Sequence, residues 1–259
     1  MIENIIKQKY LIDIEKIEKN KESTVGNVYI IYTKNNKYVA KVYDDLNHVL
    51  SMVYLHSDLC DKIYIPKIIN TKEDKGYVEI PNSKYIVLYS FLDGVQLCKK
   101  FNKLPDEIIK KIAVELRNFH KLTNNENKYK LPYVPFCKNY NIKRVSTLHF
   151  DLTRHNIFFN ENKIGFIDFD DAKYGPSVCD VAIIVAILFF SKKRGVDLVG
   201  LNLFIDTYYN KDIELKLKEM PYIKTFALNW IDYITSENEF DTSIKESFDI
   251  KHRLIEENF

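Results

Sequence analysis

Four polar residues stand at the ends of two short apolar runs in the middle of the chain. His149 and Asp151 follow the first run, Asn156 comes five residues after Asp151, and Asp168 ends the apolar run 164–167. Polar side chains at the tips of strands can point into a shared cleft. An amide oxygen and a carboxylate suit Mg²⁺, which is usually held by one or two protein groups and by substrate phosphates. Asp151 is then left to orient or deprotonate a hydroxyl, as phosphoryl transfer requires.

The residues around this group resemble a known family. Two stretches carry the resemblance: HFDLTRHNIFF, which starts at His149, and IGFIDFDDAKYGPSVCDVA, which starts at Ile164. They are similar to the signature of the aminoglycoside phosphotransferase superfamily, a branch of the protein-kinase-like fold that includes choline, homoserine and methylthioribose kinases. The resemblance implies that Asp151 is the catalytic base.

It also implies the roles of the other residues in these stretches. Asn156 and Asp168 would be the Mg²⁺ ligands. Asp180 would brace the catalytic loop from the next helix, and His149 would help to hold that loop. Because isolated motifs are weak and motifs in the expected order are strong, this block is the most specific part of the resemblance.

The first third of the chain resembles the nucleotide-binding part of such kinases. YVAKVY is similar to the strand that carries the ATP-phosphate lysine, here Lys41. The resemblance implies ATP or GTP as the phosphoryl donor. It places the loop that covers the phosphates at Ser23, Gly26 and Asn27. It places the hinge beside the purine at Tyr89, Ser90 and Phe91.

Three features depart from the family pattern. Phe150 stands where Gly is common, and the nucleotide loop has a single glycine, Gly26. The helix after Lys41 contains no Glu to pair with that lysine. The acids near this helix are Asp44, Asp45, Asp58 and Asp61. A nucleotide-binding pseudo-kinase without turnover is therefore a competing hypothesis.

The elements that position these residues are predicted from hydrophobic periodicity. Residues 1 to about 20 are predicted to form a helix, as are 48–59, 105–122, 178–192, 198–209, 213–235 and 243–257. Strands are predicted at 28–33, 38–43, 77–80 and 85–91, with another opening at Pro66. The sequence thus predicts an α+β, bilobal, protein-kinase-like fold. Residues 1–93 would form the nucleotide-binding lobe, a small antiparallel sheet, and 94–259 a mostly helical catalytic and acceptor-binding lobe.

Composition excludes several other classes of protein. The chain has 259 residues, 46% of them hydrophobic, and a formal charge of +2, so neither disorder nor nucleic-acid binding is indicated. Its four cysteines are far apart, which argues against a zinc site or a disulfide framework. The first residues lack the apolar core of a signal peptide, and the longest apolar run, 181–190, is too short to span a bilayer. We expect a cytoplasmic protein with no membrane partner, of undetermined oligomeric state.

The acceptor is indicated only by charge. Residues 121–147 are too few for a large helical insertion before the catalytic loop, so the C-terminal helices are expected to form the acceptor pocket. The final segment, 236–259, carries more acids than bases, which suits a cationic acceptor. An aminoglycoside or similar amino-sugar is the first hypothesis. Choline, homoserine and a protein Ser or Thr are the alternatives.

Overall fold

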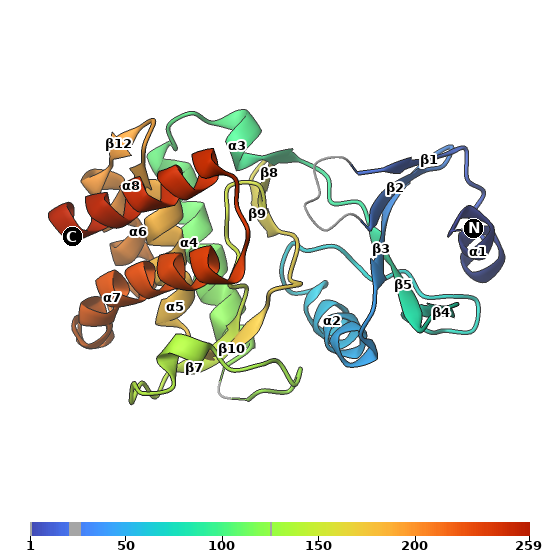
Figure 1. Cartoon of the computed structure of the whole chain (residues 1–259), viewed down its shortest axis with the longest axis horizontal. Coiled ribbons are helices and arrows are strands. Elements are labelled where there is room, and N and C mark those ends of the chain that lie inside the picture. The colour runs from blue at the N-terminus through green and yellow to red at the C-terminus, as the bar shows by residue number, and fades with distance from the viewer. Residues whose placement is uncertain (1, 21–26, 125) are drawn as a thin grey trace. The chain divides into compact units, whose positions relative to one another are not determined.

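The computed structural model describes residues 2–20, 27–124 and 126–259 (Figure 1). The chain divides into two compact units, 1–93 and 94–259. The first is built around an antiparallel sheet, and the second consists mainly of helices with short β-ribbons. The α+β fold predicted from the sequence is confirmed.

The sheet of the first unit has five strands in the order β1-β2-β3-β5-β4, all antiparallel. They are β1 (Lys16–Lys19), β2 (Val28–Tyr32), β3 (Lys37–Tyr43), β4 (Val78–Ile80) and β5 (Lys84–Ser90). In the register of the central strand β3, Lys41 lies opposite Val28 on one side and Val87 on the other. The predicted lysine strand is therefore held by neighbours on both edges.

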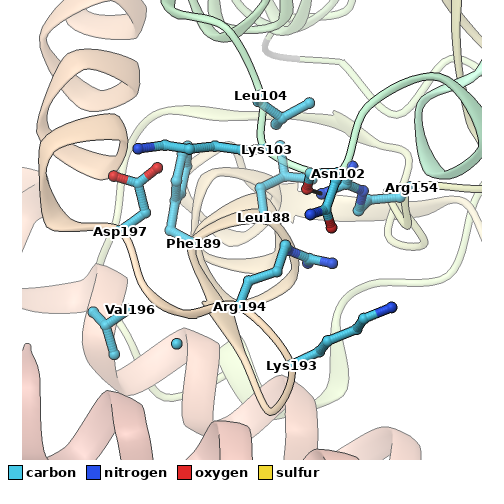
Figure 2. A pocket seen from close by; sticks show the side chains of 11 residues that line it. Asn102, Lys103, Leu104, Arg154, Leu188, Phe189, Lys193, Arg194, Val196 and Asp197 are labelled. Atoms are coloured by element: carbon cyan, nitrogen blue, oxygen red, sulfur yellow. Dashed lines mark hydrogen bonds between the residues drawn. The ribbon is translucent and has the colours of Figure 1, made fainter.

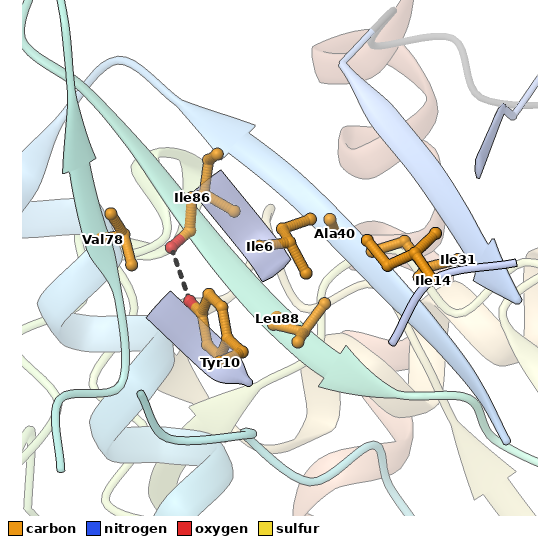
Figure 3. Close-up of a cluster of buried hydrophobic side chains, with 8 residues drawn as sticks. All are labelled: Ile6, Tyr10, Ile14, Ile31, Ala40, Val78, Ile86 and Leu88. Carbon is orange, nitrogen blue, oxygen red and sulfur yellow. Dashed lines mark hydrogen bonds between the residues drawn. The ribbon is translucent and has the colours of Figure 1, made fainter. Parts of the chain in front are cut away.

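Helix α1 (Ile2–Tyr10) packs on one face of this sheet (Figure 3). The Tyr10 hydroxyl donates to the carbonyl oxygen of Ile86 at 3.3 Å. The buried cluster on this face is Ile6, Tyr10, Ile14, Ile31, Ala40, Val78, Ile86 and Leu88. The prediction of one helix over residues 1–20 was wrong. The chain leaves the helix at Leu11, whose φ is +56°, and residues 16–19 pair with β2 instead, so strand pairing prevails over local periodicity.

Helix α2 (Leu46–Leu59) packs on the other face, against the residues of β5 that alternate with those facing α1. Its N-cap is Asp45, whose carboxylate accepts from the Asn47 N–H at 2.8 Å. The strand predicted to open at Pro66 was wrong, because only Ile68 forms an isolated bridge, to Tyr89.

The second unit is built around residues 178–190, all of which are buried. Its strands are β6 (Val95–Gln96), β7 (Val145–Leu148), β8 (Ile157–Asn160), β9 (Lys163–Phe166), β10 (Lys173–Pro176), β11 (Phe190–Ser191) and β12 (Gly195–Val196). Its α-helices are α3 (Leu97–Lys100), α4 (Asp106–Leu122), α5 (Val178–Ile184), α6 (Leu198–Tyr209), α7 (Ile213–Glu237) and α8 (Thr242–Asn258). The helices predicted at 105–122, 198–209, 213–235 and 243–257 are confirmed, with small changes at their ends. None of the helices in the described ranges is both long enough and apolar enough to span a bilayer.

The helix predicted over 178–192 is interrupted. Helix α5 ends at Ile184, a π-helical turn covers Val185–Phe189, and the chain then enters the β11–β12 hairpin. The ammonium group of Lys251, in α8, donates to the carbonyl oxygens of Ala186 at 3.2 Å and Phe190 at 2.8 Å. A buried cation from a distant helix thus takes up the carbonyls at this irregular end, which local periodicity could not indicate.

Lys251 is expected to make stability rise with pH between about 8 and 10.5. Burial, and then the charges of Arg194 and Arg154, lower the pKa of Lys251 from 10.5 to about 8. In this window the unfolded chain binds more protons than the folded protein, so raising the pH favours the folded state, by about 3 kcal/mol over the window. Urea unfolding at several pH values should show this slope in the parent protein and not in Lys251→Met. The same slope in both proteins would contradict the prediction.

Candidate active site

The register of the short strands gathers the predicted catalytic residues. Leu148 at the end of β7 lies opposite Lys173 at the start of β10, and Ile157 at the start of β8 lies opposite Phe166 at the end of β9. The start of the loop 149–156 therefore lies beside the end of the turn 167–172, and the end of the loop lies beside the start of the turn. The Ile167 N–H donates to the Asn156 carbonyl oxygen at 3.0 Å, which joins the two segments.

Asn156 holds Asp151 directly. Its amide nitrogen donates to the backbone oxygen of Asp151 at 2.9 Å and to the Asp151 carboxylate oxygen Oδ2 at 2.7 Å. Both amide protons are used by these bonds, so the oxygen Oδ1 of Asn156 is the atom left to accept or to bind a cation. The spacing of five residues thus closes the loop and fixes the orientation of both side chains.

His149 joins the loop to the strand that precedes Asp168. Its side chain is fully buried, and its Nε2 lies 2.9 Å from the carbonyl oxygen of Ile167. The Asp151 N–H donates to the other ring nitrogen at 3.4 Å. Burial lowers the pKa of His149, so the ring is neutral at neutral pH, with Nε2–H as donor and Nδ1 as acceptor. His149 thus links Asp151 to Ile167.

Asp180 anchors the loop from α5. Its buried carboxylate accepts from the His149 N–H at 2.7 Å and from the Phe150 N–H at 2.9 Å. A third bond joins it to Nε2 of His120, in α4, at 3.1 Å. These contacts fix the backbone immediately before Asp151, as a brace of the loop requires.

Behind Asp180 lies a buried polar network that the sequence interpretation did not include. His120 Nδ1 lies 2.7 Å from the Tyr208 hydroxyl, which also accepts from Arg144 at 3.0 Å. Arg144 in turn forms a bidentate ion pair with Glu219, at 2.8 and 2.5 Å. Tyr208 in α6, Glu219 in α7 and Arg144 just before β7 come from separate segments, and no motif links them.

Phe150 occupies a backbone conformation that favours glycine. Its φ is +68°, and its ring is only 3% exposed, stacked on Phe136 at 6.0 Å between centroids. The Trp230 indole N–H, from α7, donates to the Phe150 carbonyl oxygen at 3.2 Å. Phe150 thus combines a positive φ with a buried aromatic ring.

Phe150→Gly is expected to be more stable than Phe150→Ala by about 1–2 kcal/mol, because only glycine adopts positive φ without strain. Both variants should be less stable than the parent, since losing a buried Phe ring costs about 3–5 kcal/mol. Urea unfolding measures the difference. Phe101, in ordinary extended backbone at φ −127°, provides the matched pair, for which the Gly variant should be the less stable. The same order at both positions would contradict the prediction.

Carboxylates crowd around Asp151. Burial, and then the negative charges of Asp171 and Asp168, raise the pKa of Asp151 to about 7, although the Asn156 amide opposes this. Asp168 is exposed and has φ +67°, at the end of the segment that follows β9. This excess of negative charge, with the oriented oxygen of Asn156, is a donor set that fits a hard divalent cation. The described residues contain no group of three or more His, Cys, Asp or Glu that could hold a metal ion.

The comparisons with known proteins agree with this geometry. Residues 141–202, which contain the loop, Asp168 and Asp180, match the model of the phosphotransferase enzyme family. The match covers about a quarter of the chain. The resemblance to the aminoglycoside phosphotransferase superfamily is thereby confirmed. No curated protein matches the sequence.

Solved phosphotransferase structures share the fold over nearly the whole chain. An amicoumacin kinase in complex with AMP-PNP and Ca²⁺ has a TM-score of 0.74 at 13% identity, over 100% of this chain and 93% of that one. A spectinomycin phosphotransferase in complex with ADP and spectinomycin has a TM-score of 0.63 at 16% identity, over 98% and 95%. A microcompartment-associated aminopropanol kinase has a TM-score of 0.67 at 12% identity, over 98% and 94%. At these identities the likeness establishes the fold.

The nucleotide residues implied by the phosphotransferase resemblance lie in the first unit. Ser23 and Gly26 fall outside the described residues. Asn27 precedes β2, and its carbonyl oxygen accepts from the Val42 N–H at 3.0 Å. Tyr89 and Ser90 end β5 and Phe91 follows it. The N–H groups of Ser90 and Phe91 donate to the carbonyls of Lys67 at 2.8 Å and Lys37 at 3.2 Å, so these two donors are already engaged within the protein.

The acids near α2 are also engaged elsewhere. Asp44 pairs with Lys84 at 3.0 Å, Asp58 with Lys62 at 2.6 Å and Asp61 with Lys67 at 2.6 Å. Asp45 is the N-cap of α2. Helix α2 itself contains no glutamate.

Proposed function

We propose that this protein is a small-molecule kinase that transfers the γ-phosphoryl group of ATP or GTP to an acceptor hydroxyl. The observation that carries the proposal is the bonding of Asn156 to Asp151. The Asn156 amide nitrogen fixes the Asp151 carboxylate, which would orient the acceptor hydroxyl. The same bonds leave the Asn156 side-chain oxygen as a ligand for the metal ion. In this proposal unit 1–93 binds the nucleotide through Lys41, and unit 94–259 carries catalysis and the acceptor site.

Asn156 and Asp168 would hold Mg²⁺, which when bound neutralises the charge of the donor phosphates. Asp151 accepts the hydroxyl proton or aligns the hydroxyl for attack. Asp180 and His149 keep Asp151 in place through the backbone, without touching either substrate. Two of the similar structures contain ADP or GDP, and a third contains AMP-PNP together with Ca²⁺. These ligands support the proposal that this protein binds a nucleotide and a divalent cation.

The acceptor is proposed to carry a positive charge, as an amino-sugar does. Tyr233, in α7, lies against the Phe150 ring at 5.8 Å, and burial followed by the charges of Glu237 and Asp171 raises the pKa of its hydroxyl. Asp171 also acts on Asp151. An aromatic ring flanked by carboxylates beside the catalytic base suits an amine. The acids of the terminal segment support this less, because Glu246 pairs with Lys192 and Glu256 lies near His252.

A pseudo-kinase is the second candidate, since α2 supplies no glutamate and the neighbouring acids have other partners. Such a protein would bind nucleotide without consuming it.

The test is Mg²⁺-dependent nucleotide consumption with a panel of acceptors: several aminoglycosides, choline, homoserine, a methylthio-sugar, an amino alcohol and a protein substrate. ATP and GTP are run side by side, with Asp151→Asn as the blank. Turnover with an amine-bearing small molecule that is lost in the blank supports the proposal. Phosphate on protein Ser or Thr alone would replace it with a protein kinase, and tight nucleotide binding with no turnover on any acceptor would favour the pseudo-kinase.

A further inference from the structure

A cavity in the second unit is lined mainly by basic side chains. Its volume is about 320 Å³, within the usual range of small-molecule sites. The charged residues in its lining are Lys103, Arg154, Lys193, Arg194 and Asp197. Figure 2 shows the ends of Lys193 and Arg194 reaching from the β11–β12 hairpin toward the side of the cavity on which Arg154 lies. Four cations thus face one carboxylate.

Internal partners do not offset this charge. Within the described parts of the chain, the side chains of Lys103, Lys193 and Arg194 form no ion pair or hydrogen bond. Asp197 already acts as the N-cap of α6, where its carboxylate accepts from the Gly200 N–H at 2.9 Å. Figure 2 shows the Lys103 ammonium at the Asp197 end of the cavity and the ends of Lys193 and Arg194 on the other side, where the lining contains no acid.

Arg154 is the buried member of the group. Its guanidinium donates to the carbonyl oxygens of Leu97, Phe101 and Asn102, which are neutral acceptors and leave the charge uncompensated. The Lys251 ammonium likewise donates to backbone carbonyls, those of Ala186, Ile187 and Phe190. After burial, the positive charges of Arg194 and Arg154 lower the pKa of Lys251, as expected for cations near one another. An anion in the cavity would relieve that repulsion.

We infer that this cavity binds the phosphate group of a small molecule through Arg154, Arg194, Lys193 and Lys103. Guanidinium groups present paired N–H donors that match two phosphate oxygens, and the ammonium groups add charge. The lining includes none of Asp151, Asn156 and Asp168, so this site is separate from that of the proposed phosphoryl transfer. Arg154 lies in the loop between Asp151 and Asn156, so a bound phosphate contacts the catalytic loop.

The experiment measures binding of inorganic phosphate by calorimetry at constant ionic strength, with chloride as the replaced anion. Saturable binding is expected, and Arg194→Gln and Lys193→Gln should each weaken it about tenfold, or about 1.4 kcal/mol. Lys192→Gln is the matched control, because this neighbour in the same hairpin pairs with Glu246 and does not line the cavity. All three residues are exposed, so the variants should fold.

Two further arms separate the possible results. Binding that is abolished by saturating nucleotide and unaffected by Arg194→Gln would place the phosphate at the nucleotide site and overturn the inference. An equal loss in all three variants would show only non-specific attraction and would also overturn it, as would no binding. Glucose 6-phosphate is tested beside inorganic phosphate. Tighter binding of the sugar phosphate assigns the site to phosphorylated metabolites. Equal binding of the two assigns it to free phosphate.

Discussion

Asp151→Asn is expected to lower kcat for phosphoryl transfer by about 10²–10⁴-fold, the usual contribution of a positioned general base. The substituted amide keeps the size of the side chain and an oxygen that can accept from Asn156, so the loop should retain its shape. Nucleotide affinity is expected to be unchanged, because Asp151 is not assigned to the nucleotide. Steady-state kinetics with the best acceptor of the panel, together with nucleotide titration, measure both quantities.

Stability provides the second readout for this variant. Asp151 is partly buried and faces the like charges of Asp168 and Asp171, so removing its charge should leave the free energy of unfolding unchanged or higher. A kcat within a factor of about two of the parent would be incompatible with a general base, whose loss costs at least about 10²-fold. A large loss of stability would assign Asp151 a structural role instead.

Asp180→Ala is expected to lower the free energy of unfolding by about 3–5 kcal/mol, as for loss of one partner of a buried charged network. The change leaves three buried donors without an acceptor: the N–H groups of His149 and Phe150, and Nε2–H of His120. Asp180→Asn keeps one acceptor oxygen, but its new NH₂ group faces one of these N–H donors. Its cost in unfolding free energy should therefore be smaller, about 1–3 kcal/mol. Urea unfolding at pH 7 gives both values.

The Asn variant also tests positioning. Because Asp180 fixes the backbone before Asp151, kcat should fall in Asp180→Asn while KM for the nucleotide stays the same. Asp232→Asn, on the exposed face of α7, is the control and should change stability by less than about 0.5 kcal/mol. If Asp180→Asn is folded and has the parent kcat, the carboxylate does not position the loop.

Local sequence determined much of the candidate site. The spacing of Asp151 and Asn156 closes a short loop, so both residues could be assigned to one site without knowledge of the distant chain. Most helices were predicted correctly because a periodic apolar face is a local property. The family signature predicted Asp180 as a brace of the catalytic loop, and its carboxylate accepts from two backbone N–H groups, those of His149 and Phe150.

Tertiary structure decided what depends on contacts between distant segments. The strand at 16–19 exists because β2 pairs with it, and the helix after Asp180 ends early where Lys251 takes its carbonyls. The network behind Asp180 joins His120 to Tyr208, 88 residues apart, and the basic cavity joins residues 102–104, the catalytic loop and the β11–β12 hairpin. Such arrangements have no fixed spacing in the sequence, because burial and charge are set by whichever segments the fold brings together.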